Sequence, residues 1–310
     1  MKYKSILDAV GNTPLVQIPS LSPVEGVRLW AKLEGQNPTG SVKDRVALAM
    51  IERAEASGEL SKDKAILEPT SGNTGISLAM VAKIRGYSFT AVIPDNASVE
   101  RLSLLKAFGA RIVFSDGAKG TNGAVALAQE LAASDEYYMP FQYGNGANVE
   151  VHYHTTGGEI LEDLPEVRAF VAGLGTGGTL TGVGRRLKEH DPSIKVVAAE
   201  PELGELVYGL RSLEEGYIPP VFDPDILDGR VKVTARESIV WTRELLTSGG
   251  IFAGISAGAV IWVAQRVARR LQEGDVVCLL ADAGWKYLST EAWTKDIESA
   301  ESNVEEVLWW

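Results

Sequence analysis

Short apolar runs alternate with longer amphipathic segments along most of the chain. Apolar runs bounded by turn residues are typical of buried strands, and apolar residues three or four positions apart are typical of helices. Strands are predicted at residues 13–16, 27–32, 65–68, 89–93, 111–114, 137–139, 169–172, 195–199 and 275–280, and helices at 98–108, 121–133, 179–189, 237–247 and 256–271, with one more ending at Gly86. This alternation predicts mostly parallel sheets covered by helices on both faces, the α/β class.

The strands and helices form two successive sets, separated around residues 141–149. We therefore expect two α/β domains. The predicted small domain comprises residues 35–146, and the predicted large domain comprises residues 1–34 and 147–310.

Composition narrows the kinds of partner that the protein can have. The 310 residues are 45% hydrophobic and 23% charged, as in ordinary globular proteins, and the net charge of −11 argues against a nucleic-acid partner. No apolar run is long enough to span a membrane, and no long apolar segment precedes Asp8, so we expect neither a membrane protein nor a signal peptide. The single cysteine, Cys278, lies in an apolar run and is predicted to be a buried strand residue. A chain without disulfides fits a reducing, cytoplasmic location.

Histidines provide little sign of a metal site. We expect His152 and His154 to lie at the start of a helix and His190 to lie at the end of one. None of the three has other metal-ligating residues at suitable spacing, so no metal is expected.

Residues 37–45, NPTGSVKDR, are the first candidate for chemistry. Their proline and glycine break regular structure, and Ser41 is a suitable helix cap. Apolar residues at helical spacing begin at Val46, so Lys43 falls in the first turn of a helix, where the macrodipole disfavours a cation. This position favours the neutral amine that forms a covalent bond with a carbonyl group. The alternative is a solvated lysine paired with a neighbouring carboxylate.

Two glycine-rich turns each join a predicted strand to a predicted helix. TSGNTG, residues 70–75, offers backbone donors and hydroxyls to a small anion such as a carboxylate. GLGTGGT, residues 173–179, permits the close backbone approach that a phosphate needs. The second turn also reads GxGxxG, and Glu200 follows at a spacing compatible with a ribose-binding acid. A nicotinamide-dependent oxidoreductase is therefore an alternative.

Taken together and in order, these stretches resemble the signature loops of the cysteine synthase family. The matching segments are PTGSVKDR, TSGNTG and GTGGT, together with GNTPL at 11–15, GISAG at 254–258 and DAG at 282–284. The likeness covers nearly the whole chain. It implies a pyridoxal-phosphate enzyme of fold type II, the tryptophan-synthase-β type, with two open, mostly parallel twisted sheets flanked by helices.

The resemblance implies a role for each matching residue. Lys43 would bind the cofactor covalently and then remove the substrate α-proton, Asn73 would hydrogen-bond the ring hydroxyl oxygen, and Ser256 would meet the pyridine nitrogen. A hydroxyl at that nitrogen makes a weaker electron sink than a carboxylate, which fits β-elimination better than transamination. The cofactor phosphate would be held by Gly175, Thr176, Gly177, Gly178 and Thr179, and the substrate carboxylate by Thr70, Ser71, Thr74 and Gln142.

The implied reaction is β-replacement through an α-aminoacrylate intermediate, carried out by a homodimer in which the small domain closes on the substrate. It makes L-cysteine from O-phosphoserine or O-acetylserine and a sulfur donor. Cystathionine β-synthase, serine or threonine dehydratase, and a non-catalytic protein that keeps the fold are alternatives. Whether a serine acetyltransferase binds stays open.

The segment around Arg211 resembles the O-phosphoserine sulfhydrylase subgroup, also called cysteine synthase B, in which an arginine receives the substrate phosphate. A surface arginine paired with Glu214 or Glu215 is the alternative. The subgroup implies that the thiocarboxylated C-terminus of a small sulfur-carrier protein donates the sulfur, and free sulfide stays open. It also implies that the apolar tail, residues 307–310, folds into the active-site cleft to shield the intermediate. A dimer contact is the alternative role of this tail.

Overall fold

A computed structural model describes residues 2–70, 72–95 and 99–306, and backbone contacts group the chain into two compact units. Unit 1 contains Lys43–Asn148 and the described residues up to Val10. Unit 2 contains Gly11–Val42 and Val149–Glu306. The predicted small domain, residues 35–146, stays a prediction, and residues 35–42 are grouped here with unit 2.

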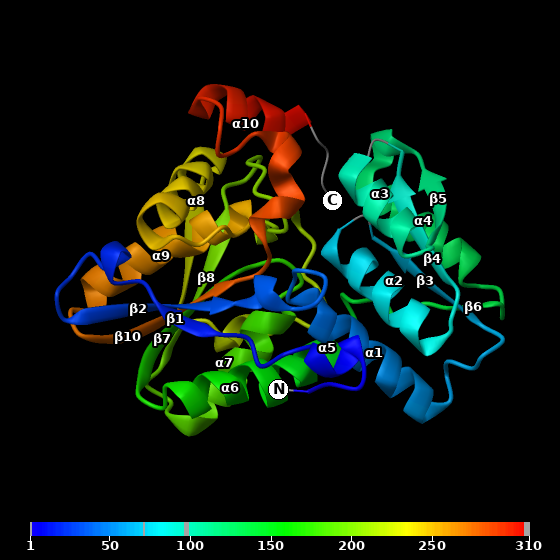
Figure 1. Cartoon of the computed structure of the whole chain (residues 1–310), viewed down its shortest axis with the longest axis horizontal. Helices are drawn as coiled ribbons and strands as arrows, with labels where there is room; N and C mark the ends of the chain where they lie inside the picture. Colours follow the sequence, from blue (N-terminus) through cyan, green and yellow to red (C-terminus); the bar gives the residue numbers. More distant parts are fainter. Residues whose placement is uncertain (1, 71, 96–98, 307–310) are drawn as a thin grey trace. The chain divides into compact units, whose positions relative to one another are not determined.

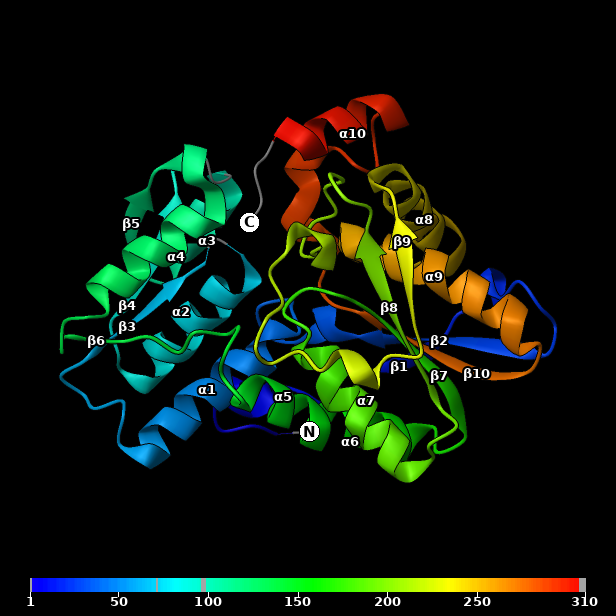
Figure 2. The ribbon, with the colours of Figure 1, turned by 180° about the vertical axis from the view of Figure 1, so that it is seen from behind.

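Unit 1 is built on a parallel four-stranded sheet in the order β5-β4-β3-β6. Helices α2 and α3 follow β3 and β4 while the chain moves in one direction across the sheet, and α4 returns it. Right-handed crossovers therefore place α2 and α3 on one face and α4 on the other, as Figures 1 and 2 show. The elements are β3 (Ala65–Pro69), β4 (Phe89–Pro94), β5 (Arg111–Ser115), β6 (Tyr137–Tyr138), α1 (Lys43–Ser57), α2 (Asn73–Arg85), α3 (Val99–Ala107) and α4 (Gly120–Leu131). The short helix α5 (Ala147–Val151) contains the boundary between the two units.

Unit 2 is built on a six-stranded sheet in the order β1-β2-β10-β7-β8-β9, in which only the β1–β2 pair is antiparallel. Helices α8 and α9 cover one face and α6 and α7 cover the other (Figures 1 and 2). The elements are β1 (Leu15–Gln17), β2 (Val27–Leu33), β7 (Val167–Gly173), β8 (Lys195–Pro201), β9 (Gly229–Val233), β10 (Gly274–Leu280), α6 (Gly157–Asp163), α7 (Gly178–His190), α8 (Ala235–Gly249), α9 (Ile255–Leu271) and α10 (Ile297–Glu306).

The two faces of this sheet have separate apolar cores. Along β7, Ala169 and Val171 belong to the core beneath α8 and α9, whereas Phe170 and Ala172 belong to the core on the α6–α7 side. This alternation follows from the two-residue period of a strand, and burial on both faces explains why β7 is apolar throughout. Cys278 of β10 lies in the first core, and burial raises the pKa of its thiol to about 12. The prediction of a buried strand cysteine is confirmed.

The predicted strands and helices are present, with boundaries shifted by a few residues. Three elements were missed: the half-buried strand β9 and the helices α5 and α10. A further difference lies at His152–Thr156, which forms a π-helical turn, η5, between α5 and α6, so His152 and His154 lie within a helical segment rather than at its start. Short 3₁₀ helices lie at Ile6–Ala9, Pro19–Leu21, Glu34–Gln36, Gly117–Lys119, Leu213–Glu215, Pro224–Ile226 and Gly284–Thr290. Among the described residues, no helix is both long enough and apolar enough to cross a bilayer.

Candidate active site

The predicted lysine lies at the start of a helix. Lys43 is the first residue of α1 and is half-buried. Just before it, the Val42 amide donates to the Ala281 carbonyl at 2.8 Å, and Ser41 forms a β-bridge with Asp282. These extended-backbone contacts stop the helix from beginning earlier, so Lys43 falls in the turn where the helix dipole disfavours a cation. The predicted placement of Lys43 is confirmed.

The residue after the lysine joins two helices of unit 1. Asp44 is fully buried, and its carboxylate accepts a hydrogen bond from the Ser77 hydroxyl of α2 at 2.6 Å. This bond fixes the first turn of α1 against the helix that begins at Asn73.

The 70–75 turn follows β3 and leads into α2. Gly72 is the N-cap of α2, and no described side chain caps that helix. Thr70 Oγ1 accepts from the Gly72 amide at 3.3 Å, which curls the turn around the helix N-terminus. Such an end is suited to a carboxylate, because backbone amides and the helix dipole both favour an anion. Ser71, predicted to share this role, lies outside the described residues.

The structure brings Thr74 and Gln142 together, although they are far apart in sequence. The Thr74 hydroxyl donates to Gln142 Oε1 at 2.7 Å, and both side chains are buried. Two predicted carboxylate-binding residues of unit 1 are therefore neighbours.

Sequence reasoning missed Glu68, which holds the Gln142 segment in place. Glu68 is fully buried near the end of β3, and its carboxylate accepts from the amides of Phe141 at 2.8 Å and Gln142 at 3.0 Å. Burial raises the pKa of Glu68 to about 7, and the two amide hydrogen bonds oppose that rise. A glutamate inside the apolar run of β3 was the available signal.

In unit 2, the predicted phosphate turn lies between β7 and α7. Gly177 has a φ of +82°, and a Cβ there would lie 2.5 Å from the Phe222 side chain. A Cβ on Gly175 would lie 2.7 Å from the Gly209 carbonyl. Only glycine fits either position. Gly177 is the N-cap of α7 and has no side chain to cap it, and Thr176 Oγ1 accepts from the Gly178 amide at 3.3 Å. The turn fits a phosphate dianion.

His152 is a second residue that sequence reasoning missed. It is fully buried, with its Nδ1 at 3.0 Å from Thr156 Oγ1 and its Nε2 at 3.2 Å from Thr179 Oγ1. His152 therefore contacts the hydroxyl of a predicted phosphate-binding residue. No sequence pattern reveals this, because the contact depends on the π-helical turn and on the close packing of α7, where a Cβ on Gly182 would lie 2.3 Å from the Val149 carbonyl.

Ser256 lies in the first turn of α9 and is 7% exposed. Gly254 is the N-cap of this helix. The Gly254 amide donates to the Asp282 carbonyl at 2.9 Å, and the bridge between Ser41 and Asp282 connects the same loop to the segment before Lys43. The start of α9 and the start of the lysine segment are therefore fixed by one loop.

The Arg211 segment lies against the phosphate turn within unit 2. The Arg211 amide donates to the Leu174 carbonyl at 2.7 Å, and Gly209 is the residue that Gly175 approaches closely. The Arg211 guanidinium lies 5.0 Å from the centre of the Tyr217 ring. The backbone of Arg211 is thus held beside the turn, and its side chain lies over the Tyr217 ring.

Glu200, the acid considered for a ribose, has another function in the structure. It is buried, and its carboxylate accepts from Lys232 Nζ at 2.9 Å, Arg230 at 3.1 Å and the Leu213 amide at 2.8 Å. Burial acts to raise the pKa of Glu200, but the hydrogen bond and charge of Lys232, with the other donors, hold it below its ordinary value. This carboxylate anchors the segment after Arg211 through bonds within the protein. Its position therefore argues against the alternative in which Glu200 binds the ribose of a dinucleotide.

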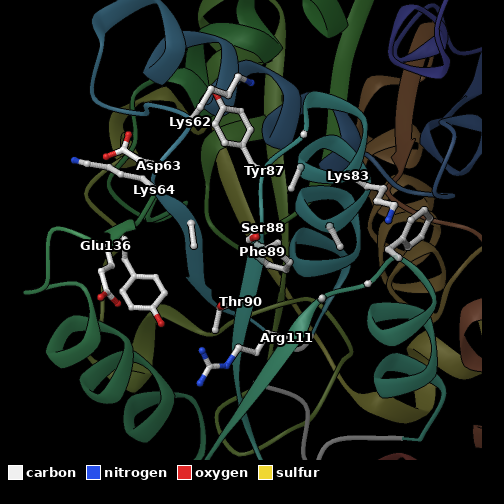
Figure 3. A pocket seen from close by; sticks show the side chains of 18 residues that line it. Lys62, Asp63, Lys64, Lys83, Tyr87, Ser88, Phe89, Thr90, Arg111 and Glu136 are labelled. Carbon is white, nitrogen blue, oxygen red and sulfur yellow. The ribbon is translucent and has the colours of Figure 1, made fainter.

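A hollow of about 720 Å³ in unit 1 lies at the opposite end of the sheet from the 70–75 turn (Figure 3). It is lined by the amino-terminal ends of β3, β4 and β5, whereas ligands of open α/β sheets bind at the carboxyl ends of the strands. One of its cations, Lys83, belongs to the last turn of α2, where a positive charge offsets the helix dipole. The hollow is therefore not the substrate site. Elsewhere among the described residues, no group of three or more histidine, cysteine, aspartate or glutamate residues is placed to hold a metal ion.

Comparison with known proteins gives one consistent family. Residues 6–282 match the family model described as pyridoxal-phosphate dependent enzyme. A cysteine synthase of Staphylococcus aureus is 42% identical over 302 residues, which cover 94% of this chain and 97% of the relative. A solved cysteine synthase of Entamoeba histolytica superposes with a TM-score of 0.90 at 32% identity, covering 98% of this chain and 96% of the other. An O-ureido-L-serine synthase structure reaches 0.90 at 39% identity, covering 96% and 97%.

These matches extend over nearly all of the chain and agree with the fold described above. They confirm the predicted fold type and the predicted cofactor, whereas the roles of individual residues stay predictions. The chain belongs to the pyridoxal-phosphate-dependent enzymes of the cysteine synthase type, and pyridoxal phosphate is its cofactor.

Proposed function

We propose that this protein makes L-cysteine by β-replacement and that its amino-acid substrate is O-phosphoserine. The cysteine synthases among its relatives support the reaction class. The observation that carries the choice of substrate is the Arg211 segment, whose backbone is hydrogen-bonded to Leu174 of the phosphate turn.

An arginine at this position suits a phosphorylated substrate. The planar guanidinium binds a phosphate dianion through two parallel hydrogen bonds, and the acetyl group of O-acetylserine offers no comparable charge. Glu214, considered above as a partner of Arg211, forms an ion pair with Lys232 at 3.2 Å. The Tyr217 ring restricts the motion of the Arg211 guanidinium. Less side-chain freedom is then lost when the phosphate binds.

The other predicted residues complete the proposed reaction. Thr70, Thr74 and Gln142 hold the substrate carboxylate at the start of α2, and Lys43 Nζ takes the α-proton. The bound cofactor supplies the electron sink that accepts the resulting charge. Phosphate then leaves from Cβ toward Arg211, and a sulfur nucleophile forms the new bond at that carbon.

The proposal extends to partners and place. The sulfur donor is the thiocarboxylated C-terminus of a small sulfur-carrier protein or free sulfide, and the enzyme is a cytoplasmic homodimer. The tail proposed to shield the intermediate, residues 307–310, lies outside the described residues.

The substrate is tested by comparing kcat/KM for O-phosphoserine and O-acetylserine in the wild type and in Arg211→Ala. We expect the variant to lose roughly 100-fold or more on O-phosphoserine, the size of a lost charge-assisted pair, and only a few-fold on O-acetylserine. Arg211→Lys keeps the charge without the planar guanidinium, so its kcat/KM for O-phosphoserine should lie between the values of the wild type and Arg211→Ala. Arg236→Ala, a substitution on the exposed face of α8, is the control.

Equal losses on both substrates would remove Arg211 as the phosphate-binding residue. Turnover to cystathionine, or to a keto acid without added sulfur, would instead favour the alternatives of the same fold.

A further inference from the structure

Glu68 is a buried carboxylate whose described partners are backbone amides. One of its oxygens accepts from the Phe141 amide and the other from the Gln142 amide, at 2.8 and 3.0 Å. No described lysine, arginine or histidine forms an ion pair with it. Burying a charge without a counter-ion is costly, so such a residue usually serves a purpose beyond packing.

The segment that Glu68 holds has an uncommon backbone. Phe141 has a φ of +54°, the left-handed region that side chains other than glycine, asparagine and aspartate rarely adopt. Its carbonyl accepts from the Gly144 and Asn145 amides, and the Asn148 side chain donates to the Gln142 carbonyl at 2.9 Å. The two bonds to Glu68 therefore fix the entry to a tight turn that ends at Asn148.

This turn determines where the Gln142 side chain lies. Gln142 Oε1 accepts from Thr74, so its Nε2 hydrogens are the donors that this side chain presents. Donors are what a substrate carboxylate needs. Glu68 precedes Thr70 by two residues, so one strand end fixes both the 70–75 turn and the Gln142 segment.

We propose that Glu68 is the positioning residue that aligns Gln142 with the 70–75 turn for binding the substrate α-carboxylate. This inference rests on the proposed function, since it assumes that an amino-acid carboxylate binds at that turn. Glu68 acts through Gln142 and does not touch the substrate.

The test uses the holoenzyme and the variant Glu68→Gln, which keeps the size of the side chain but replaces one acceptor by an NH₂ group. We expect KM for the amino-acid substrate at pH 8 to rise at least ten-fold, with kcat changed less than three-fold. The melting temperature should not fall at pH 8, because the substitution also removes a buried charge. Amide hydrogen exchange of the peptide containing residues 141–142 should become faster at the same pH. Glu68→Asp keeps the charge but is too short to reach both amides, so its KM should lie between those of the wild type and Glu68→Gln.

The pH dependence separates positioning from packing. Protonation turns one carboxylate oxygen into a hydroxyl donor, so that oxygen no longer accepts the hydrogen bond from its backbone amide. The wild-type KM should therefore rise as pH falls below about 7, the pKa of Glu68. Tyr138 of β6 is the titratable group whose charge interaction with Glu68 is recorded, and Glu59 and Arg53 act on Tyr138 in turn. Burial raises the pKa of Tyr138 to about 12, so this phenol stays neutral through the range. Tyr138→Phe should therefore keep the wild-type profile, and Glu68→Gln should flatten it.

An unchanged KM with unchanged exchange at residues 141–142 would overturn the inference, as would a loss of activity that only follows a lower melting temperature. If Glu68→Gln does not fold, exchange in the wild type decides the matter. Corrected for the intrinsic rate, it must be faster at pH 6 than at pH 8 at these two amides. A wild-type protein without β-replacement activity would instead refute the proposed function, and the exchange measurement would still test the role of Glu68.

Discussion

At the scale of single residues, the position of each group in its helix or strand determines its chemistry more than its identity does. Lys43 is one of 30 lysine and arginine residues, yet it stands at a helix N-terminus directly after a segment fixed by backbone contacts. Glu68 and Glu200 are both buried glutamates, but the pKa of Glu68 is raised and that of Glu200 is lowered, because Lys232 and Arg230 face only the latter. Burial alone therefore does not tell whether a carboxylate is charged.

The first residue-scale prediction concerns the covalent bond to the cofactor. Lys43→Ala should remove the borohydride-reducible visible absorbance and lower β-replacement by at least roughly 1,000-fold, because both the covalent anchor and the base are lost. Mass spectrometry after borohydride reduction should locate the adduct on Lys43 in the wild type. Lys83→Ala, in the last turn of α2, is the matched control. An adduct on any other lysine would contradict the assignment.

The second residue-scale prediction concerns stability and pH. The pKa of Glu68 is raised from 4.5 to about 7, so between these pH values the folded protein keeps a proton that the unfolded chain has lost. The contribution of Glu68 to the free energy of unfolding is therefore fully present below pH 4.5 and falls by roughly 3 kcal/mol as pH rises through 7. Chemical denaturation at pH 5.5 and pH 8 should show about 2 kcal/mol of this loss in the wild type, because the rest occurs at lower pH. In Glu68→Gln, which does not titrate, the difference should be smaller by about that amount.

At the scale of elements, the candidate site residues of each unit lie in turns at the carboxyl ends of parallel strands. The 70–75 turn follows β3, the phosphate turn follows β7 and the Asp282 loop follows β10. Each turn leads into a helix or contacts the start of one. In each turn the backbone of a glycine packs so closely against its neighbours that an added Cβ would clash. The phosphate turn shows this most clearly.

Gly177→Ala tests that turn. The substitution places a Cβ at a φ of +82° and 2.5 Å from the Phe222 side chain. The backbone term alone costs about 1 kcal/mol, and the clash adds to it. Affinity for pyridoxal phosphate, followed by its absorbance, should fall at least ten-fold. Gly250→Ala has a similar φ, +68°, with nothing within 4 Å of the new Cβ, and should lose stability without losing cofactor affinity. Equal cofactor affinity in the two variants would contradict the phosphate assignment.

Much of this arrangement was predictable from the sequence, because strand and helix periodicity is a local property. The alternation of apolar runs located β7 and α7, and glycine spacing located the turn between them. The strand β9 could not be predicted for a physical reason. In β9, Arg230 and Lys232 alternate with valines at the edge of the sheet, so the strand lacks a continuous apolar run. Both Glu68 and His152 act on residues more than 25 positions away, and no local pattern encodes such contacts.

At the scale of the whole molecule, each unit has its own buried core, and the cofactor adds stability to the folded chain. A ligand that binds only the native state stabilises it in proportion to RT ln(1 + [L]/Kd), about 2.7 kcal/mol at a hundred-fold excess over Kd. Removing pyridoxal phosphate should therefore lower the melting temperature by several degrees, and adding it back should restore that temperature. In Lys43→Ala, added pyridoxal phosphate should raise the melting temperature by less than it does in the wild type. A melting temperature independent of the cofactor would show that it is not bound to the native state.

The buried thiol of Cys278 has a practical consequence for an enzyme proposed to release a thiol product. The chain has one cysteine, and its sulfur lies within an apolar core as a protonated group, out of reach of alkylating and disulfide reagents. Native enzyme at high concentration should therefore give no background with a colorimetric disulfide reagent. Every equivalent of colour in such an assay then counts a molecule of newly formed product or of added sulfur donor, and the catalyst cannot be consumed by the reagent that measures it.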